Sequence, residues 1–237
     1  MYSILDPLVN GIAAIINWMY SLTISAHIAS YGLAIILFTI LLKIVLYPLT
    51  LKQMKSMYMM QRLGPKIKEI QSKYKGKDPK KMQEKVMELY KEHNVNPLSG
   101  CLPLLVQMPI LIALFQTLRT FEYKELSHAG FLWIPNQSEM NNLFYFGLPI
   151  PMLALLAAVT TFFQTRLTTN MQDQTQKMML FTMPLMIGYF AMKVPAGLAL
   201  YWVTFNTLGI LQQHIVNKQT KALKEAIPEG AGDRKNG

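Results

Sequence analysis

The chain has 237 residues, of which 51% are hydrophobic and only 15% are charged, and its formal net charge is +10. A soluble domain of this size carries about 25% charged residues, whereas here the charge is concentrated in residues 52–92 and long stretches elsewhere have almost none. The composition excludes an ordinary soluble domain and indicates a membrane protein, whose basic residues face anionic lipid and set orientation rather than bind DNA.

The N-terminal segment, residues 1–30, predicts an amphipathic helix on the outer surface of the membrane. Leu8, Ile12, Ile15 and Met19 recur at helical spacing, while asparagines interrupt the apolar run. We interpret the segment as a helix lying in the interface, and the alternative is an additional span. It lacks the basic region of a cleavable signal peptide.

The first expected span is residues 31–51, about 21 residues and so about 30 Å long. Pro48 lies near its end, where a break is least costly. Residues 52–98 follow as a cytoplasmic helical hairpin, because twelve Lys or Arg and five Asp or Glu lie between residues 52 and 92. At the hairpin turn, Asp78 is the expected N-cap and Pro79 the first helical residue.

Four more spans are expected, which makes the fold class an all-α membrane protein with five transmembrane helices. The spans are residues 99–121, 147–166, 178–192 and 197–216, separated by an outer loop (122–146), a cytoplasmic link (167–177) and an outer turn (193–196), and followed by a basic tail (217–237). The positive-inside rule places the hairpin and the tail in the cytoplasm, so the N-terminus is outside and the C-terminus inside.

Lys43 is the unusual residue of the first span, because a charge this far from either end costs about 2.5–3.5 kcal/mol on insertion scales. Snorkelling of the lysine to the cytoplasmic headgroups, about 12 Å away, is one interpretation. None of the five expected spans contains Asp or Glu. We therefore favour compensation by water and neutral polar groups, in a wet cavity open to the cytoplasm.

Several polar side chains of the spans are candidates to line such a cavity. They are Thr39 one turn before Lys43, Gln107 in the second span, Thr161, Gln164 and Thr165 in the third, and Trp202, Asn206, Gly209 and Gln213 on one face of the fifth. Each alone is more typical of helix–helix contact, but together they favour a lined cavity. The 17 methionines are either ordinary apolar filler or a pliable surface for varied apolar segments.

No catalytic set is visible in the sequence. It contains no HExxH, GxSxG or phosphate-loop motif. The single cysteine, Cys101, excludes an internal disulfide, and the four histidines have no metal-ligand spacing. We expect no metal, no cofactor and no enzymatic activity.

Three stretches resemble the YidC family of membrane protein insertases. They are the first span followed by YPLTLKQMKSMYMMQRLGPK (47–66), then PLSGCLPLLVQMPILIALF (97–115), and then PAGLALYWVTFNTLGILQQ (195–213). The resemblance is to the short form of Gram-positive-type bacteria. It implies five spans around a hydrophilic groove that is open to the cytoplasm and to lipid but closed outside, with residues 3–25 as the outer interfacial helix.

The resemblance also implies roles for individual residues. Lys43 takes the place of the family's groove arginine, which is a departure, because arginine keeps its charge and binds two acceptors whereas lysine is a point charge that can lose its proton when desolvated. The implied groove lining is Lys43, Thr39, Gln107, Gln164, Trp202 and Asn206. The hairpin is implied to meet the substrate first, through Met57, Met60, Lys66, Met82 and Met87.

The function implied by the resemblance is that of an insertase and chaperone in the bacterial plasma (inner) membrane. It would take nascent hydrophobic segments into the lipid bilayer without ATP, alone or with the Sec translocase, and with the signal recognition particle system and the ribosome as partners. The residues alone leave two alternatives open, a small solute transporter or channel and a scaffold subunit of a membrane complex. The absence of internal repeats and the large basic hairpin argue against a transporter.

Overall fold

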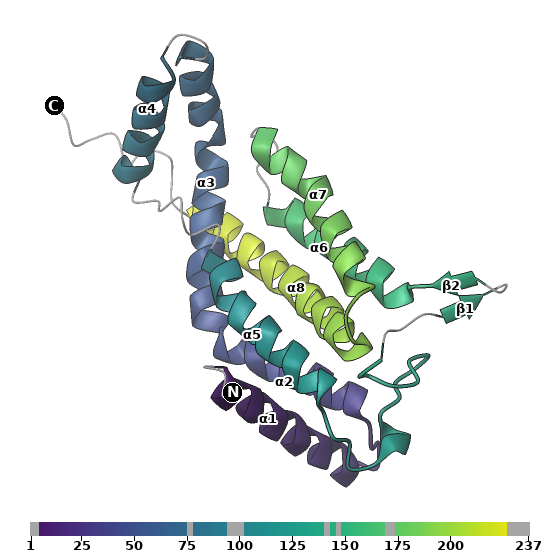
Figure 1. Ribbon diagram of the computed structural model, residues 1–237. Coiled ribbons are helices and arrows are strands. Elements are labelled where there is room, and N and C mark those ends of the chain that lie inside the picture. Colours follow the sequence, from purple (N-terminus) through teal and green to yellow (C-terminus); the bar gives the residue numbers. More distant parts are fainter. Residues whose placement is uncertain are drawn as a thin grey trace.

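Helices make up nearly all of the computed structural model, which describes residues 5–74, 78–93, 102–139, 143–145, 148–168 and 174–226 (Figure 1). The elements in chain order are α1 (Asp6–Ser25), α2 (Tyr31–Val45), α3 (Tyr47–Tyr74), α4 (Pro79–Glu92), α5 (Leu102–Arg119), a 3₁₀ turn (Leu126–His128), β1 (Leu143–Tyr145), β2 (Leu148–Ile150), α6 (Met152–Thr168), α7 (Gln174–Ala191) and α8 (Ala196–Ala226). The expected all-helical class is confirmed, apart from one short antiparallel hairpin of β1 and β2.

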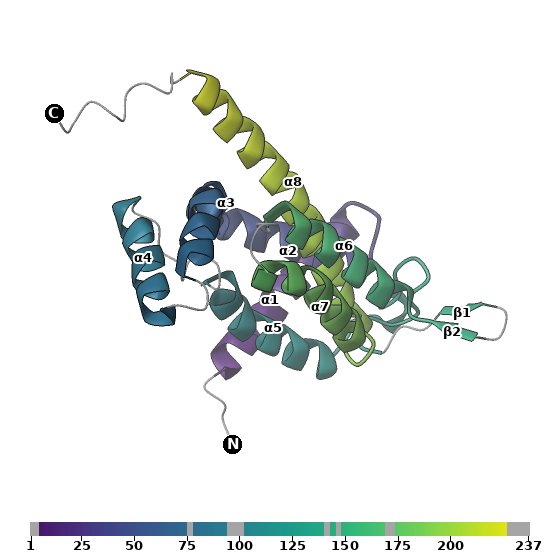
Figure 2. The same cartoon turned by 90° about the horizontal axis from the view of Figure 1, so that it is seen from above.

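Helix α8 is the centre of the arrangement (Figures 1 and 2). It packs against α2 on one side and α6 on the other, while α1 packs on α2, α7 packs on α6, and α5 contacts both α1 and α8. One apolar cluster joins α1, α2, α5 and α8 through fully buried side chains such as Ile16, Ile35 and Leu114. A second joins α6, α7 and the start of α8 through Ala157, Ile187 and Ala199. Alanines at this second contact allow close helix approach.

Length and hydropathy single out α1 among the helices of the described residues as able to cross a bilayer by itself. Helix α2 and the first part of α3 pass the same test only when they are taken together as one bent element. Shorter apolar stretches occupy Leu105–Arg119 of α5, Met152–Leu167 of α6 and Lys177–Ala191 of α7.

A break at Leu46 divides the segment predicted as a continuous helix over residues 31–51. Helix α2 ends at Val45, α3 begins at Tyr47, and the two helices are bent by 66°. Pro48 accounts for the break, because it has no N–H to donate to the carbonyl of Ile44 and its ring clashes with that carbonyl in a continuous helix. The bend separates α2 from the polar hairpin.

The hairpin of α3 and α4 has its own small core. Asp78 is the N-cap of α4 and accepts a hydrogen bond of 3.0 Å from the backbone N–H of Lys81, and Pro79 occupies the first turn, as the sequence predicts. Leu63 of α3 and Leu89 of α4 are buried against each other's helix. The hairpin projects away from the other helices (Figure 1).

Three boundaries differ from the predicted spans, and prolines explain the first of them. Helix α6 begins at Met152 rather than 147, because Pro149 and Pro151 hold the preceding residues extended, and strand β2 occupies Leu148–Ile150. Helix α7 begins at Gln174, inside the predicted link. Helix α8 continues to Ala226, ten residues beyond the predicted end at 216, because its polar continuation still has helix-forming residues.

The segment of residues 120–139, here called the closing loop, ties α2, α5 and α8 together at the end opposite the hairpin. The backbone N–H groups of Ala196 and Gly197, at the start of α8, donate to the carbonyls of Glu139 and Gln137, at 2.7 and 2.8 Å. These two donors are among those that a helix N-terminus leaves without an intrahelical partner. The loop therefore caps α8 directly.

Side chains fasten the same loop to α5. The hydroxyl of Ser138 donates to the carbonyl of Leu118 at 2.8 Å, and the Tyr123 hydroxyl lies 2.8 Å from the Ser138 oxygen. Because Ser138 has a single proton and gives it to Leu118, Tyr123 is the donor in the second bond. Burial raises the pKa of Tyr123, in keeping with its role as a hydrogen-bond donor.

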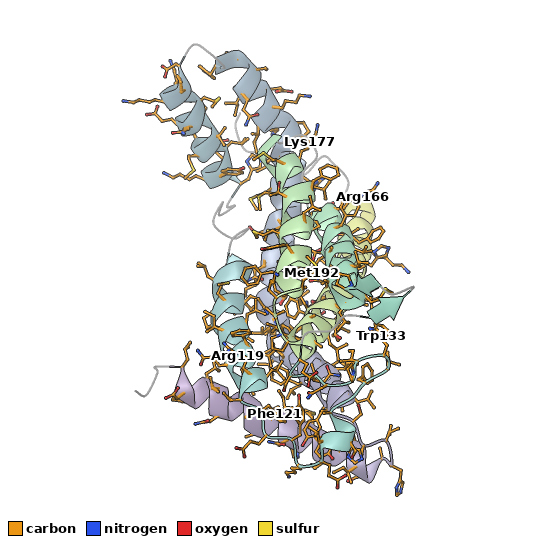
Figure 3. The ribbon with its side chains drawn as sticks, turned by 45° about the vertical axis from the view of Figure 1, so that its right-hand side comes forward. Arg119, Phe121, Trp133, Arg166, Lys177 and Met192 are labelled. Atoms are coloured by element: carbon orange, nitrogen blue, oxygen red, sulfur yellow. The ribbon has the colours of Figure 1, made fainter. Side chains whose placement is uncertain are left out.

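Aromatic rings fasten the loop to α1 and α2. The rings of Tyr20 and Tyr31 stack with their centroids 3.9 Å apart, and Phe121 and Tyr123 pack edge-on against Tyr31. The Tyr31 hydroxyl also accepts a bond of 3.0 Å from the backbone N–H of Lys124. Figure 3 shows Phe121 at this end of the molecule, opposite Arg166 and Lys177, which lie toward the hairpin.

Candidate functional site

Lys43 lies on the face of α2 that packs toward α8. It is only 8% exposed, and it is the one Lys, Arg, Asp or Glu side chain that is buried in the described part of the chain. The ion pairs found among the described residues are Lys85 with Glu88 and His128 with Glu125, so no described carboxylate neutralises Lys43. The lysine in the middle of the apolar run is therefore buried in the structure, and no carboxylate of the described residues pairs with it.

An aromatic ring is one partner of the Lys43 ammonium group. The Lys43 nitrogen lies 3.6 Å from the centroid of the Phe205 ring of α8, well within the range of cation–π attraction. The Phe205 ring packs against Tyr201 one turn earlier, with centroids 5.7 Å apart. Tyr201 is fully buried, and its hydroxyl accepts a hydrogen bond from the side-chain amide of Gln107 in α5.

Gly209 provides the space in which the lysine head group lies. A Cβ atom at this position would be 3.2 Å from the Lys43 nitrogen and 2.7 Å from the side-chain nitrogen of Gln164 in α6. Lys43 of α2 and Gln164 of α6 therefore approach the same point on α8 from the two helices that flank it. We call Lys43, Gln107, Gln164, Tyr201, Phe205 and Gly209 the Lys43 cluster. Four helices, α2, α5, α6 and α8, contribute to it.

Two other predicted groove residues bond to different partners. The amide of Asn206 donates to the hydroxyls of Thr161 at 2.8 Å and Thr160 at 3.3 Å, which joins α8 to α6. The Thr39 side chain is completely buried and donates to the carbonyl of Ile35 at 2.7 Å in its own helix. Trp202 is half-buried and packs against the apolar cluster of α6 and α7.

The predicted docking residues of the hairpin divide into packed and exposed ones. Met60 packs against the buried Leu63 and Leu89 but is itself only half-buried. Met57 and Met82 are half-buried, whereas Lys66 and Met87 are exposed. The exposed surface of the hairpin is thus basic with single apolar side chains.

Sequence reasoning missed Phe205 as a partner of Lys43 and Tyr201 as the ring that packs against Phe205. A signal for Phe205 was present, since it lies three residues after Trp202 and four before Gly209, on the α8 face already selected as polar. The search for compensation considered only polar groups and water, and so passed over an aromatic face. The cluster as a whole combines one cation with neutral donors and a ring, which suits the binding of an anionic or polar group.

Comparison with known proteins gives a family match over most of the chain. Residues 23–224 match the family described as 60Kd inner membrane protein. A protein of Leptospira interrogans, named membrane protein insertase YidC, is 42% identical over 94% of this chain. A Chlorobaculum tepidum protein with the same name is 40% identical over 87% of this chain. The chain spans only about a third of these relatives, 36% and 35% of their lengths.

A solved structure has the same fold. The crystal structure of an active YidC insertase, with its first transmembrane domain resolved, superimposes with a TM-score of 0.67 and 31% sequence identity. The match covers 89% of this chain and 46% of that one.

Proposed function

The chain belongs to the family of 60Kd inner membrane proteins that includes the YidC insertases, and from that membership we propose that it inserts nascent hydrophobic segments into the lipid bilayer without ATP hydrolysis. It works alone or with the Sec translocase, and it receives substrates from the ribosome and the signal recognition particle system. Lys43 carries the proposal, because it is buried without a described counter-charge where four helices meet.

The proposed mechanism begins at the hairpin and ends in lipid. A nascent segment docks on Met57, Met60, Lys66, Met82 and Met87, and its short outer tail enters a hydrophilic groove lined by Lys43, Thr39, Gln107, Gln164, Trp202 and Asn206. Attraction between Lys43 and an acidic tail residue contributes ~1–4 kcal/mol at an effective dielectric between 80 and 20. Release of the apolar segment into lipid is downhill by about 0.8 kcal/mol per CH₂ group.

Five spans, with the N-terminus outside and the hairpin and C-terminus in the cytoplasm, complete the proposal. Arg166 and Lys177 lie at the hairpin end of α6 and α7 (Figure 3), as the positive-inside rule requires for a cytoplasmic end. The groove opens toward this end. At the other end, the closing loop bonds to α5 and α8, which supports closure on the outside.

Helix α1 is proposed to lie in the outer interface, although its length and hydropathy also suit a span. We expect cysteines at Asn10 and Ser25, which are both exposed and lie near opposite ends of α1, to react with a membrane-impermeant thiol reagent added outside. Cys101 is replaced in both variants. Reaction of one position from outside and the other only from inside would show that α1 crosses the membrane.

The test of function is insertion by the purified chain in nucleotide-free liposomes. We expect a short-tailed single-span substrate to become protected from external protease only when the chain is present, with no increase in the leakage of small anions. Anion flux without insertion would favour a transporter or channel. If the purified chain shows neither insertion nor anion flux, but supports insertion as part of a larger complex, the result would favour a scaffold.

The groove itself is tested by water accessibility at position 43. A Lys43→Cys chain, again without Cys101, is expected to react with the impermeant reagent from the cytoplasmic side alone. Reaction from both sides would indicate a channel, and no reaction from either side would mean a dry, packed position and remove the groove from the mechanism.

A further inference from the structure

We propose that Phe205 and Gly209 are positioning residues that hold the Lys43 ammonium in the membrane as an uncompensated charge ready for an acidic segment. This inference rests on the proposed function. It adds to that function a way for Lys43 to keep a positive charge where the family has an arginine. Neither residue belongs to the groove lining implied by the resemblance to the family.

The ring of Phe205 lies directly beneath the charge of Lys43. The distance of 3.6 Å from the Lys43 nitrogen to the ring centroid places the ammonium directly on the electron-rich face. This distance lies within the range of cation–π attraction, and little of the Lys43 side chain is exposed. The ring therefore stabilises the charged form at a depth where no described carboxylate does so.

The position of the ring is itself determined by other helices. Tyr201 packs on Phe205 within α8 and on Phe38 of α2, with centroids 5.7 and 6.4 Å away. Gln107 of α5 fixes the Tyr201 hydroxyl by a hydrogen bond. Because the ring is held from α2 and α5, it offers the lysine one site rather than a mobile surface.

Gly209 completes the site one helical turn after the ring. A side chain at this position would meet the Gln164 amide at 2.7 Å and the Lys43 nitrogen at 3.2 Å. Both are ends of flexible side chains, so an alanine there would displace the ammonium rather than unfold the helix. The glycine thus sets where the charge lies.

A ring differs from a carboxylate as a partner because it leaves the net charge of the site at +1. A buried salt bridge would have to be broken by each arriving acidic residue, at a cost comparable with the gain. On the ring, the ammonium keeps its net charge, and a substrate carboxylate adds to the existing contact. Neutral tails gain nothing from this arrangement, so the pair favours acidic ones.

The decisive variants are Phe205→Leu, which removes the ring, and Phe205→Tyr, which keeps it. In the liposome assay we expect Phe205→Leu to reduce insertion of an acidic-tailed substrate by about 5- to 30-fold, the equivalent of ~1–2 kcal/mol. The same substrate with a neutral tail should change less than about twofold, and Phe205→Tyr should behave as the unaltered chain.

Two further arms separate charge positioning from simple packing. Lys43→Arg added to Phe205→Leu should restore insertion of the acidic-tailed substrate, because the guanidinium keeps its charge without the ring. Equal losses for acidic and neutral tails, or no rescue by arginine, would overturn the proposal. So would undiminished insertion of the acidic-tailed substrate by Phe205→Leu.

A measurement independent of insertion tests the contact directly. With lysines labelled at the ε-carbon, one methylene signal should be shifted upfield by the ring, and it should be absent in Lys43→Arg and return to the ordinary position in Phe205→Leu. A chain that shows this signal but inserts nothing would refute the proposed function and leave the positioning intact. Absence of the shifted signal from the unaltered chain would refute the positioning.

Discussion

Lys43→Glu is expected to reduce insertion of acidic-tailed segments by at least about tenfold. The lysine attracts a tail carboxylate by ~1–4 kcal/mol, and a glutamate in its place repels the same carboxylate by a similar amount. The substitution also removes the ammonium group from the face of Phe205. The measurement is the protease-protected fraction of an acidic-tailed substrate in liposomes, beside that of a basic-tailed partner of equal length.

The matched control is Lys68→Glu, which makes the same charge change on the exposed surface of α3. Surface charges in water interact weakly, so we expect it to change insertion of the acidic-tailed substrate by less than about threefold. In the Lys43→Glu chain, the inserted fraction of the basic-tailed substrate should rise relative to that of the acidic-tailed one. If both substrates were inserted as well by Lys43→Glu as by the unaltered chain, Lys43 would have no part in charge capture.

The second large effect is expected on stability, from Gly32→Ala at the start of α2. A Cβ atom on Gly32 would lie 2.3 Å from both Cβ and Cγ of Phe131 in the closing loop. The phenylalanine cannot yield by moving a flexible end, because the contact is at the base of its side chain. We expect the free energy of unfolding to fall by about 1–3 kcal/mol, the usual cost of overpacking.

Gly11→Ala is the control for this change. Gly11 lies in helix α1 with nothing within 4 Å of the added carbon, so alanine should stabilise the chain by up to about 1 kcal/mol through helix propensity. Thermal unfolding in detergent, followed for both variants under one set of conditions, measures the difference. A midpoint for Gly32→Ala at or above that of the unaltered chain would show that the closing loop does not pack on α2 as described.

The features that the sequence predicted well depend on local chemistry. Asp78 and Pro79 start a helix because their own side chains satisfy or avoid the first N–H groups. The burial of Lys43 follows from its place in a long apolar run. The all-helical fold and the family follow from the long apolar runs and from the three stretches that resemble the YidC family.

The features that were not predicted depend on how distant elements meet. The contact of Lys43 with Phe205 requires the register of α2 against α8, which no pattern within either helix contains. Pro48 is compatible with either a kink or a simple helix end, so the sequence did not predict the 66° bend at Leu46. The strand at Leu148–Ile150 lies in a stretch so apolar that it was predicted as part of a span. Trp202 and Asn206 were both predicted to line a groove, but Trp202 packs against the apolar cluster of α6 and α7 and Asn206 donates to Thr161 of α6.

The closing loop also has a consequence for the order in which the chain assembles during its own synthesis. Its contacts with Tyr31, Gly32 and Leu118 involve residues made earlier, so they are available as soon as the loop leaves the ribosome. Its bonds to Ala196 and Gly197 join residues made roughly 60 positions later, a delay of about 3–12 s at 5–20 residues per second. During that interval α1, α2 and α5 form a half-built bundle without α8, and Lys43 has neither its ring nor its glycine. The nascent protein thus passes through a stage in which Lys43 lacks the contacts with α8 that surround it in the finished fold.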